Sequence, residues 1–117
     1  MYKEKLHMAD VVVAFSTFPA DQDATSLAQD LVGSGLAACV HVVPGVTSVY
    51  TWKGVPQVDR EQQLVIKTTS DMVDDLFDAL KARHPYETPE FVVMAVVDGS
   101  DDYLDWVEES VGRRKES

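Results

Sequence analysis

Short apolar runs alternate with amphipathic stretches along this chain. Residues 11–15, Val-Val-Val-Ala-Phe, are apolar at successive positions and rich in β-branched side chains, which predicts a strand buried on both faces. Residues 24–35 then repeat apolar side chains at the spacing of one helical stripe, and Gly33 is a suitable end. We expect this helix to open at Pro19 and Asp21.

A long hairpin follows this helix. Residues 36–52 form one predicted strand, Lys53-Gly54 forms a tight turn, and residues 55–69 return as the partner strand. Strands usually span only about 5–6 residues, so this hairpin is longer than a small sheet needs. Its projecting part is a candidate arm that contacts a neighbouring molecule.

The register of the hairpin depends on its bend at Pro44-Gly45. Counting back from the turn places Cys39 opposite Thr68. A bulge at Pro44-Gly45 shifts that pairing by one residue.

The second half of the chain repeats the strand and helix pattern. Ser70 is the predicted N-cap of a helix whose inner face runs over residues 73–84, and Pro85 stops it. Residues 91–97 form another strand that is apolar on both faces, and a short third helix follows Ser100. The order strand–helix–strand–strand–helix–strand plus a C-terminal helix predicts an α+β, ferredoxin-like sandwich with a long hairpin.

The apolar pattern does not suit a monomer. Helices of such a fold cover one sheet face, yet at least three strands are apolar on both. In the second strand, Cys39 and Val43 point one way, while Val40 and Val42 point the other. A contiguous apolar sheet face exposed to water is an aggregation hazard, so we expect other copies of the chain to bury it.

Composition narrows the class of protein. The 117 residues carry a formal net charge of −10, and we expect a single domain over residues 1–117 with an ordered core at about 10–111. Nucleic acid and anionic membranes need a basic patch, so neither is an expected partner, whereas cation binding and simple solubility both fit. Cys39 is the single cysteine, and no apolar leader or span is evident. We expect a cytoplasmic protein.

Candidate chemistry concentrates in residues 84–90, His-Pro-Tyr-Glu-Thr-Pro-Glu. The two prolines restrict the loop, so it presents side chains rather than merely joining elements. His84 either satisfies the end of the preceding helix or acts as a metal ligand or acid–base group. Glu61 and Lys67 lie on one face of the strand at residues 55–69. They either form a structural ion pair or serve as functional groups.

Other candidates have simpler explanations. Four aromatic side chains can line a pocket or belong to a core or interface, namely Tyr50, Trp52, Tyr103 and Trp106. Cys39 by itself is more typical of a small buried apolar residue than of a ligand. No nucleotide-binding, nucleophile-elbow or zinc-protease motif occurs. We therefore expect no enzyme, although a hydrolytic pair of His84 and Glu61 is a weaker alternative.

Several segments together resemble the CutA divalent-cation tolerance proteins. These are Leu-Ala-Ala-Cys-Val at 36–40, Pro-Gly-Val-Thr-Ser-Val-Tyr-Thr-Trp-Lys-Gly at 44–54, Leu-Val-Ile-Lys-Thr-Thr at 64–69, the 84–90 loop, and Tyr-Leu-Asp-Trp at 103–106. The resemblance covers roughly residues 11–111. It implies a ferredoxin-like subunit in a homotrimer similar to the PII signalling trimers, with a role in tolerance of divalent metals, especially copper.

The resemblance also implies roles for individual residues. Cys39 and His84 match positions proposed as copper ligands in the family. Positions lining the family's intersubunit cleft correspond here to Glu61, Lys67, Tyr86, Tyr103 and Trp106. Some relatives carry further cysteines, which this chain lacks, so Cu(II) suits its donors better than Cu(I). The alternative is a PII-like regulatory module that holds a small anion or an unidentified protein partner in the cleft.

Overall fold

The computed structural model describes residues 10–112. The expected ordered core at about residues 10–111 falls within this range, and just after it the N–H of Gly112 donates to the carbonyl of Gly35 at 2.8 Å. The elements, in chain order, are β1 (Val11–Pro19), α1 (Ala24–Gly33), β2 (Cys39–Trp52), β3 (Val55–Thr69), the 3₁₀ turn η1 (Ser70–Met72), α2 (Val73–Arg83), β4 (Val92–Ala95) and α3 (Asp101–Ser110). No helix within residues 10–112 combines the length and apolar character needed to span a bilayer.

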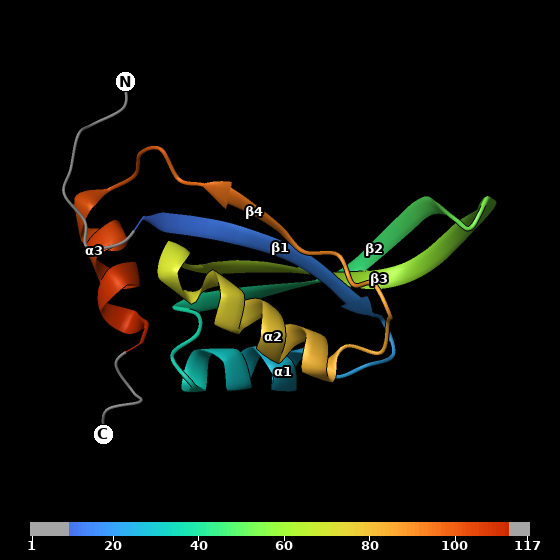
Figure 1. The fold of residues 1–117 in the computed structure, drawn as a ribbon, viewed down its shortest axis with the longest axis horizontal. Helices are drawn as coiled ribbons and strands as arrows, with labels where there is room; N and C mark the ends of the chain where they lie inside the picture. Colours follow the sequence, from blue (N-terminus) through green and yellow to red (C-terminus); the bar gives the residue numbers. More distant parts are fainter. Residues whose placement is uncertain (1–9, 113–117) are drawn as a thin grey trace.

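The strands of the described chain form one antiparallel sheet. Its order is β2-β3-β1-β4, and α1 and α2 lie side by side across one face (Figure 1). The helix α3 lies at one end of the sheet, and the β2–β3 hairpin projects beyond the other end. This arrangement confirms the predicted ferredoxin-like α+β fold with its long hairpin and extra helix.

The hairpin turn and its bulge are both as the sequence requires. Lys53 and Gly54 have φ values of 51° and 80°, which suits a two-residue turn that matches strand twist. The register shifts between Val43 and Val46, where Gly45 has a φ of 78°. Before the bulge in the chain, Cys39 pairs with Lys67, so the pairing with Thr68 that is counted from the turn is wrong by one residue.

Helix starts differ from the sequence predictions. Because β1 continues to Pro19, α1 begins only at Ala24, and the N–H of Ser26 donates to the capping carboxylate of Asp23 at 3.0 Å. Ser70 opens the 3₁₀ turn rather than capping α2 directly. Ser100 does cap α3, since its Oγ accepts from the N–H of Tyr103 at 3.1 Å.

A smaller buried cluster involves Leu104 and Val107 of α3, and the larger core cluster lies between the sheet and the helices α1 and α2. Its fully buried members alternate along the strands and repeat along the helices, and include Ala14, Phe18, Leu27, Leu31, Leu64, Ile66, Leu76 and Leu80. Burying one such leucine contributes about 1.5–3 kcal/mol. This layer fixes the position of the loop between α2 and β4.

The opposite sheet face is apolar and open. Paired residues of neighbouring strands share a face, and Phe15 pairs with both Val65 and Val92, while Val13 pairs with Met94. Val92 and Met94 are 52% and 57% exposed. The two-faced strand pattern is therefore confirmed, although β4 is shorter than the predicted strand at residues 91–97.

Candidate functional site

His84 anchors the loop between α2 and β4 to the first strand. It is the C-cap of α2 with extended backbone angles, as expected for a residue before proline, and only 9% of it is exposed. Its Nε2–H donates to the carbonyl of Thr17 at 2.7 Å, and its Nδ1 accepts from the N–H of Tyr86 at 3.1 Å. The Phe18 ring packs against its edge at 5.0 Å. Both ring nitrogens are therefore hydrogen-bonded within the chain.

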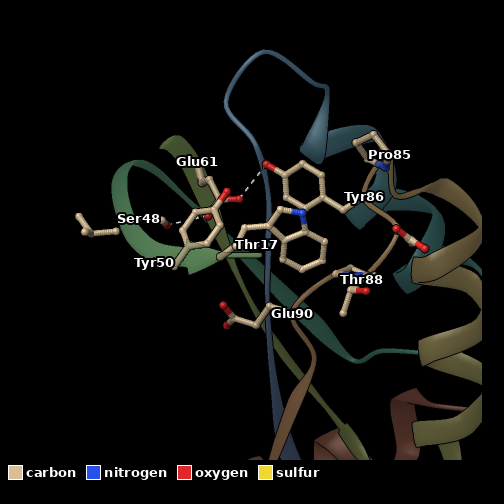
Figure 2. Close-up of a pocket in the computed structure, with 12 residues that line it drawn as sticks. Thr17, Ser48, Tyr50, Glu61, Pro85, Tyr86, Thr88 and Glu90 are labelled. Atoms are coloured by element: carbon tan, nitrogen blue, oxygen red, sulfur yellow. Dashed lines mark hydrogen bonds between the residues drawn. The ribbon is translucent and has the colours of Figure 1, made fainter. Parts of the chain in front are cut away.

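Tyr86 connects the loop to the buried carboxylate of Glu61. Its hydroxyl donates to Oε2 of Glu61 at 3.0 Å, and the hydroxyl of Ser48 donates to Oε1 at 2.6 Å (Figure 2). Glu61 is only 5% exposed. Burial and then the hydrogen bond to Glu61 raise the pKa of Tyr86 to about 12, so the phenol stays protonated at neutral pH.

These groups border a cavity of about 790 Å³, here called the acidic pocket. It lies between the projecting part of the β2–β3 hairpin and the loop at residues 85–90, and Figure 2 shows side chains from both segments around it. Its lining comprises Thr17, Ser48, Val49, Tyr50, Trp52, Glu61 and the six residues from Pro85 to Glu90. Tyr50 donates to Asp59, and this bond raises the pKa of the Tyr50 phenol. The pocket wall thus combines aromatic rings with carboxylates.

A second group of candidate residues lies at the other end of the sheet. Nζ of Lys67 is 5.5 Å from the centroid of the Tyr103 ring, and the rings of Tyr103 and Trp106 are 5.5 Å apart. Glu61 and Lys67 are separated by six positions of β3, which corresponds to roughly 20 Å along an extended strand. A single chain therefore holds the five predicted cleft residues as two separate groups, one around Glu61 and one around Lys67.

The two predicted metal ligands do not share a site within one chain. Cys39 pairs with Lys67, whereas the Thr17 that holds His84 pairs with Gln63. Four positions along β3 separate these pairs, roughly 13 Å. Among residues 10–112, no group of three or more His, Cys, Asp and Glu side chains is placed to hold a metal ion.

Sequence reasoning missed the roles of Ser48 and Thr17. Ser48 pairs with Asp59 and reaches diagonally to Glu61, which the register counted from the turn at Lys53 and Gly54 implies. Thr17 contributes its backbone carbonyl, and no side-chain pattern identifies such a role. Of the four aromatic side chains that the sequence assigns to a pocket, a core or an interface, Tyr50 and Trp52 line the acidic pocket.

The chain is similar to proteins of one family over nearly all of its described residues. A family model described as "CutA1 divalent ion tolerance protein" matches residues 12–110. The "Divalent-cation tolerance protein CutA" of Thermus thermophilus is 42% identical over 100 residues, which are 86% of this chain and 97% of the relative. The crystal structure of CutA1 from Oryza sativa superimposes with a TM-score of 0.85 at 36% identity, covering 90% of this chain and 96% of that one.

The resemblance extends to an archaeal structure. The "Periplasmic divalent cation tolerance protein CutA" from Archaeoglobus fulgidus is 30% identical with a TM-score of 0.82, over 87% of this chain and 99% of that chain. Fold, motif order and similarity along nearly the whole length agree. The chain therefore belongs to the CutA1 divalent ion tolerance family.

Proposed function

We propose that this protein is a homotrimer that binds divalent cations, copper in particular, at its subunit interfaces. The open apolar face of the sheet is the observation that carries the proposal. Val92 and Met94 are more than half exposed in one subunit, beside Phe15 and Val13. Burying such a face in an assembly removes apolar surface from water at about 25 cal/mol per Å².

The split of the candidate residues supports a head-to-tail assembly. Glu61 and Tyr86 lie at one end of the sheet, and Lys67, Tyr103 and Trp106 at the other. A cleft that contains both groups takes them from two subunits. Contacts between two different surfaces close into a ring when the rotation between neighbouring subunits permits it. In a ring of three, every subunit uses both of these surfaces.

The proposed metal ligands also require more than one subunit. Since Cys39 and His84 are separated within the chain, a shared ion takes Cys39 from one subunit and His84 from another. His84 additionally gives up one hydrogen bond, either to Thr17 or from Tyr86. One imidazole with one thiol and oxygen donors suits Cu(II) or another borderline ion rather than Cu(I).

Two measurements test the trimer and its metal site separately. Light scattering at micromolar concentration gives the mass of the native assembly, and a monomer contradicts the trimer. Titration with Cu(II) is then compared between the native protein and the variants His84→Ala and Cys39→Ser. If all three proteins bind Cu(II) equally, neither His84 nor Cys39 is a ligand, and the proposal of a trimer is unchanged.

A regulatory module is the second candidate function. The cationic Lys67 lies against Tyr103, which fits a small anion or a protein partner better than a metal ion. A thermal-shift screen separates the alternatives because a ligand stabilises the state that it binds. Stabilisation by anionic metabolites but not by metals favours the module.

We propose that the protein acts by binding rather than by catalysis. We also propose that it is located in the cytoplasm. His84 contacts a backbone carbonyl and a backbone N–H, and Glu61 accepts from two hydroxyls, so the two do not form a nucleophile and base pair. The single Cys39 suits a reducing compartment. Fractionation of cells that express the tagged protein tests the location.

A further inference from the structure

Cys39 and His41 place two metal-binding side chains on one face of β2. Successive side chains of a strand alternate between its faces, so residues two positions apart point the same way. The register agrees, since Cys39 pairs with Lys67 and His41 pairs with Val65, also two positions apart on β3. The register shift begins only after Val43, so the strand is regular through both residues. Because one strand carries both side chains, assembly into a trimer does not separate them.

Both side chains have their donor atoms available. Cys39 is a free, partly exposed thiol, and His41 is exposed. Within residues 10–112 the His41 ring makes no hydrogen bond, whereas both ring nitrogens of His84 are hydrogen-bonded. His41 therefore binds an ion without first losing a hydrogen bond, and His84 does not.

The surroundings of His41 require a polar partner once the trimer forms. Its strand partner Val65 also pairs with Phe15, so His41 lies on the apolar face that the proposed trimer buries. An imidazole buried there without a hydrogen bond or a ligand costs free energy. Lys67 lies on the same face, but its Nζ packs against Tyr103, 5.5 Å from the ring centroid. Coordination to an ion satisfies the imidazole nitrogen instead.

The donor atoms suit a borderline divalent ion. Zinc binds thiolate and imidazole at about 2.0–2.3 Å, which places two donors of a tetrahedral ion roughly 3.6 Å apart. Cα atoms two positions apart on a strand are separated by roughly 6.5–7 Å, so the two side chains reach one ion by leaning together. No described chain segment holds three His, Cys, Asp or Glu side chains placed for a metal ion. Further ligands therefore come from a second subunit or from water.

The head-to-tail assembly brings a third donor to this pair. Cys39 pairs with Lys67, which belongs to the group of residues at the Tyr103 end of the sheet. In the proposed ring, that end lies beside the Glu61 and Tyr86 end of the next subunit. The loop there begins at His84, two residues before Tyr86.

We propose that His41 is a metal ligand, which joins Cys39 of the same chain and His84 of the neighbouring subunit on one divalent ion. This inference rests on the proposed metal-binding function and adds a ligand that family membership does not supply. His41 lies between the segments at residues 36–40 and 44–54 that resemble the family, and outside both. The ion then has one thiolate and two imidazoles, and water completes its coordination.

The test is anaerobic titration with Co(II), which does not oxidise a thiol and absorbs light when a thiolate binds it. We expect the native protein to develop a sulfur-to-cobalt charge-transfer band, and Cys39→Ser to lack this band. His41→Val weakens binding by at least about tenfold, whereas His41→Cys restores a ligand and keeps the affinity. Val43→Ala is the control, because it shortens an exposed side chain on the same face without removing a donor. Light scattering compares the mass of each variant with that of the native protein.

A second measurement identifies the imidazoles that bind. The chain has three histidines, and Zn(II) shifts the ring nitrogen signals of its ligands in a nitrogen–proton correlation spectrum. We expect the signals of His41 and His84 to shift and that of His7 to stay in place. If the native protein does not bind Co(II), the metal-binding function and this inference are both overturned. The inference alone is overturned if His41→Val binds as well as the native protein, if Val43→Ala weakens binding equally, or if the His41 signal does not shift.

Discussion

Replacing Tyr86 with phenylalanine tests the bond that closes the acidic pocket. The substitution removes only the hydroxyl that donates to Glu61 at 3.0 Å, and it leaves Ser48 as the remaining donor to a carboxylate that is 5% exposed. Hydrogen bonds to charged groups contribute about 1.5–3 kcal/mol. Because the Tyr86 ring is partly exposed, we expect a loss near the lower end, about 1.5 kcal/mol.

The pKa of Tyr86 gives this loss a pH dependence of known sign. Burial and the Glu61 hydrogen bond raise the pKa from 10.0 in the unfolded chain to about 12 in the folded one. The native state therefore holds this proton more tightly, and the stabilisation is fully present below pH 10 and lost as the pH rises through 12. A shift of two units corresponds to about 2.7 kcal/mol before allowance for solvent screening, and to about 1–1.5 kcal/mol after it.

The assay is guanidinium-induced unfolding, followed by circular dichroism at fixed protein concentration because an assembly gains stability with concentration. The control is Tyr103→Phe, since the Tyr103 ring contacts Lys67 and Trp106 through its faces and phenylalanine keeps that ring. We expect Tyr86→Phe to be less stable at about pH 8, with the difference from the native protein closing towards about pH 12. Equal stability of both variants, or a gap that is constant with pH, refutes the reasoning.

The remaining predictions concern the open face and the backbone. Val65→Asp places a charge in the centre of the apolar face and should reduce the mass in light scattering to that of a monomer, whereas an acidic substitution on the solvent side of α2 should not. Gly45→Ala should lower the free energy of unfolding by about 1 kcal/mol through its positive φ alone, because a Cβ there meets no atom within 4 Å, while Gly33→Ala in α1 should raise it by about 0.5–1 kcal/mol. Arg83→Ala breaks an exposed ion pair on the helix surface and should cost less than about 1 kcal/mol in a denaturation experiment.

The sequence predicts the sheet well because the strand segments are apolar at successive positions, whereas the helix segments are apolar only at the spacing of one helical stripe. The run at residues 11–15 and the repeats of Leu27 and Leu31 lead directly to β1 and α1. Element ends are less predictable, since they depend on tertiary contacts. For example, Phe91 packs on Phe77 of α2 with ring centroids 5.0 Å apart, and β4 begins only at the next residue.

The candidate site is less predictable because its bonds join segments distant in sequence. The sequence allows two interpretations of His84, an anchor at a helix end or a ligand. The hydrogen bond to Thr17 forms only when β1 and the loop meet, so no local sequence pattern distinguishes the two interpretations. The pairing of Glu61 with Tyr86 is likewise a contact between β3 and the loop rather than a motif.

The bulge at Pro44 and Gly45 divides the hairpin into two registers. Side chains alternate between sheet faces, so a register shift of one residue moves every later side chain to the other face. Before the bulge, Cys39 pairs with Lys67; beyond it, Ser48 pairs with Asp59, on the face that also carries Glu61. The pairing of Ser48 with Asp59 follows directly from the turn at Lys53 and Gly54, so the turn places Ser48 where it donates to Glu61. The extra residue instead changes the pairing on the side away from the turn, where Cys39 faces Lys67 rather than Thr68. The turn therefore determines the donor to the buried carboxylate, and the bulge determines which residues of β3 lie beside Cys39.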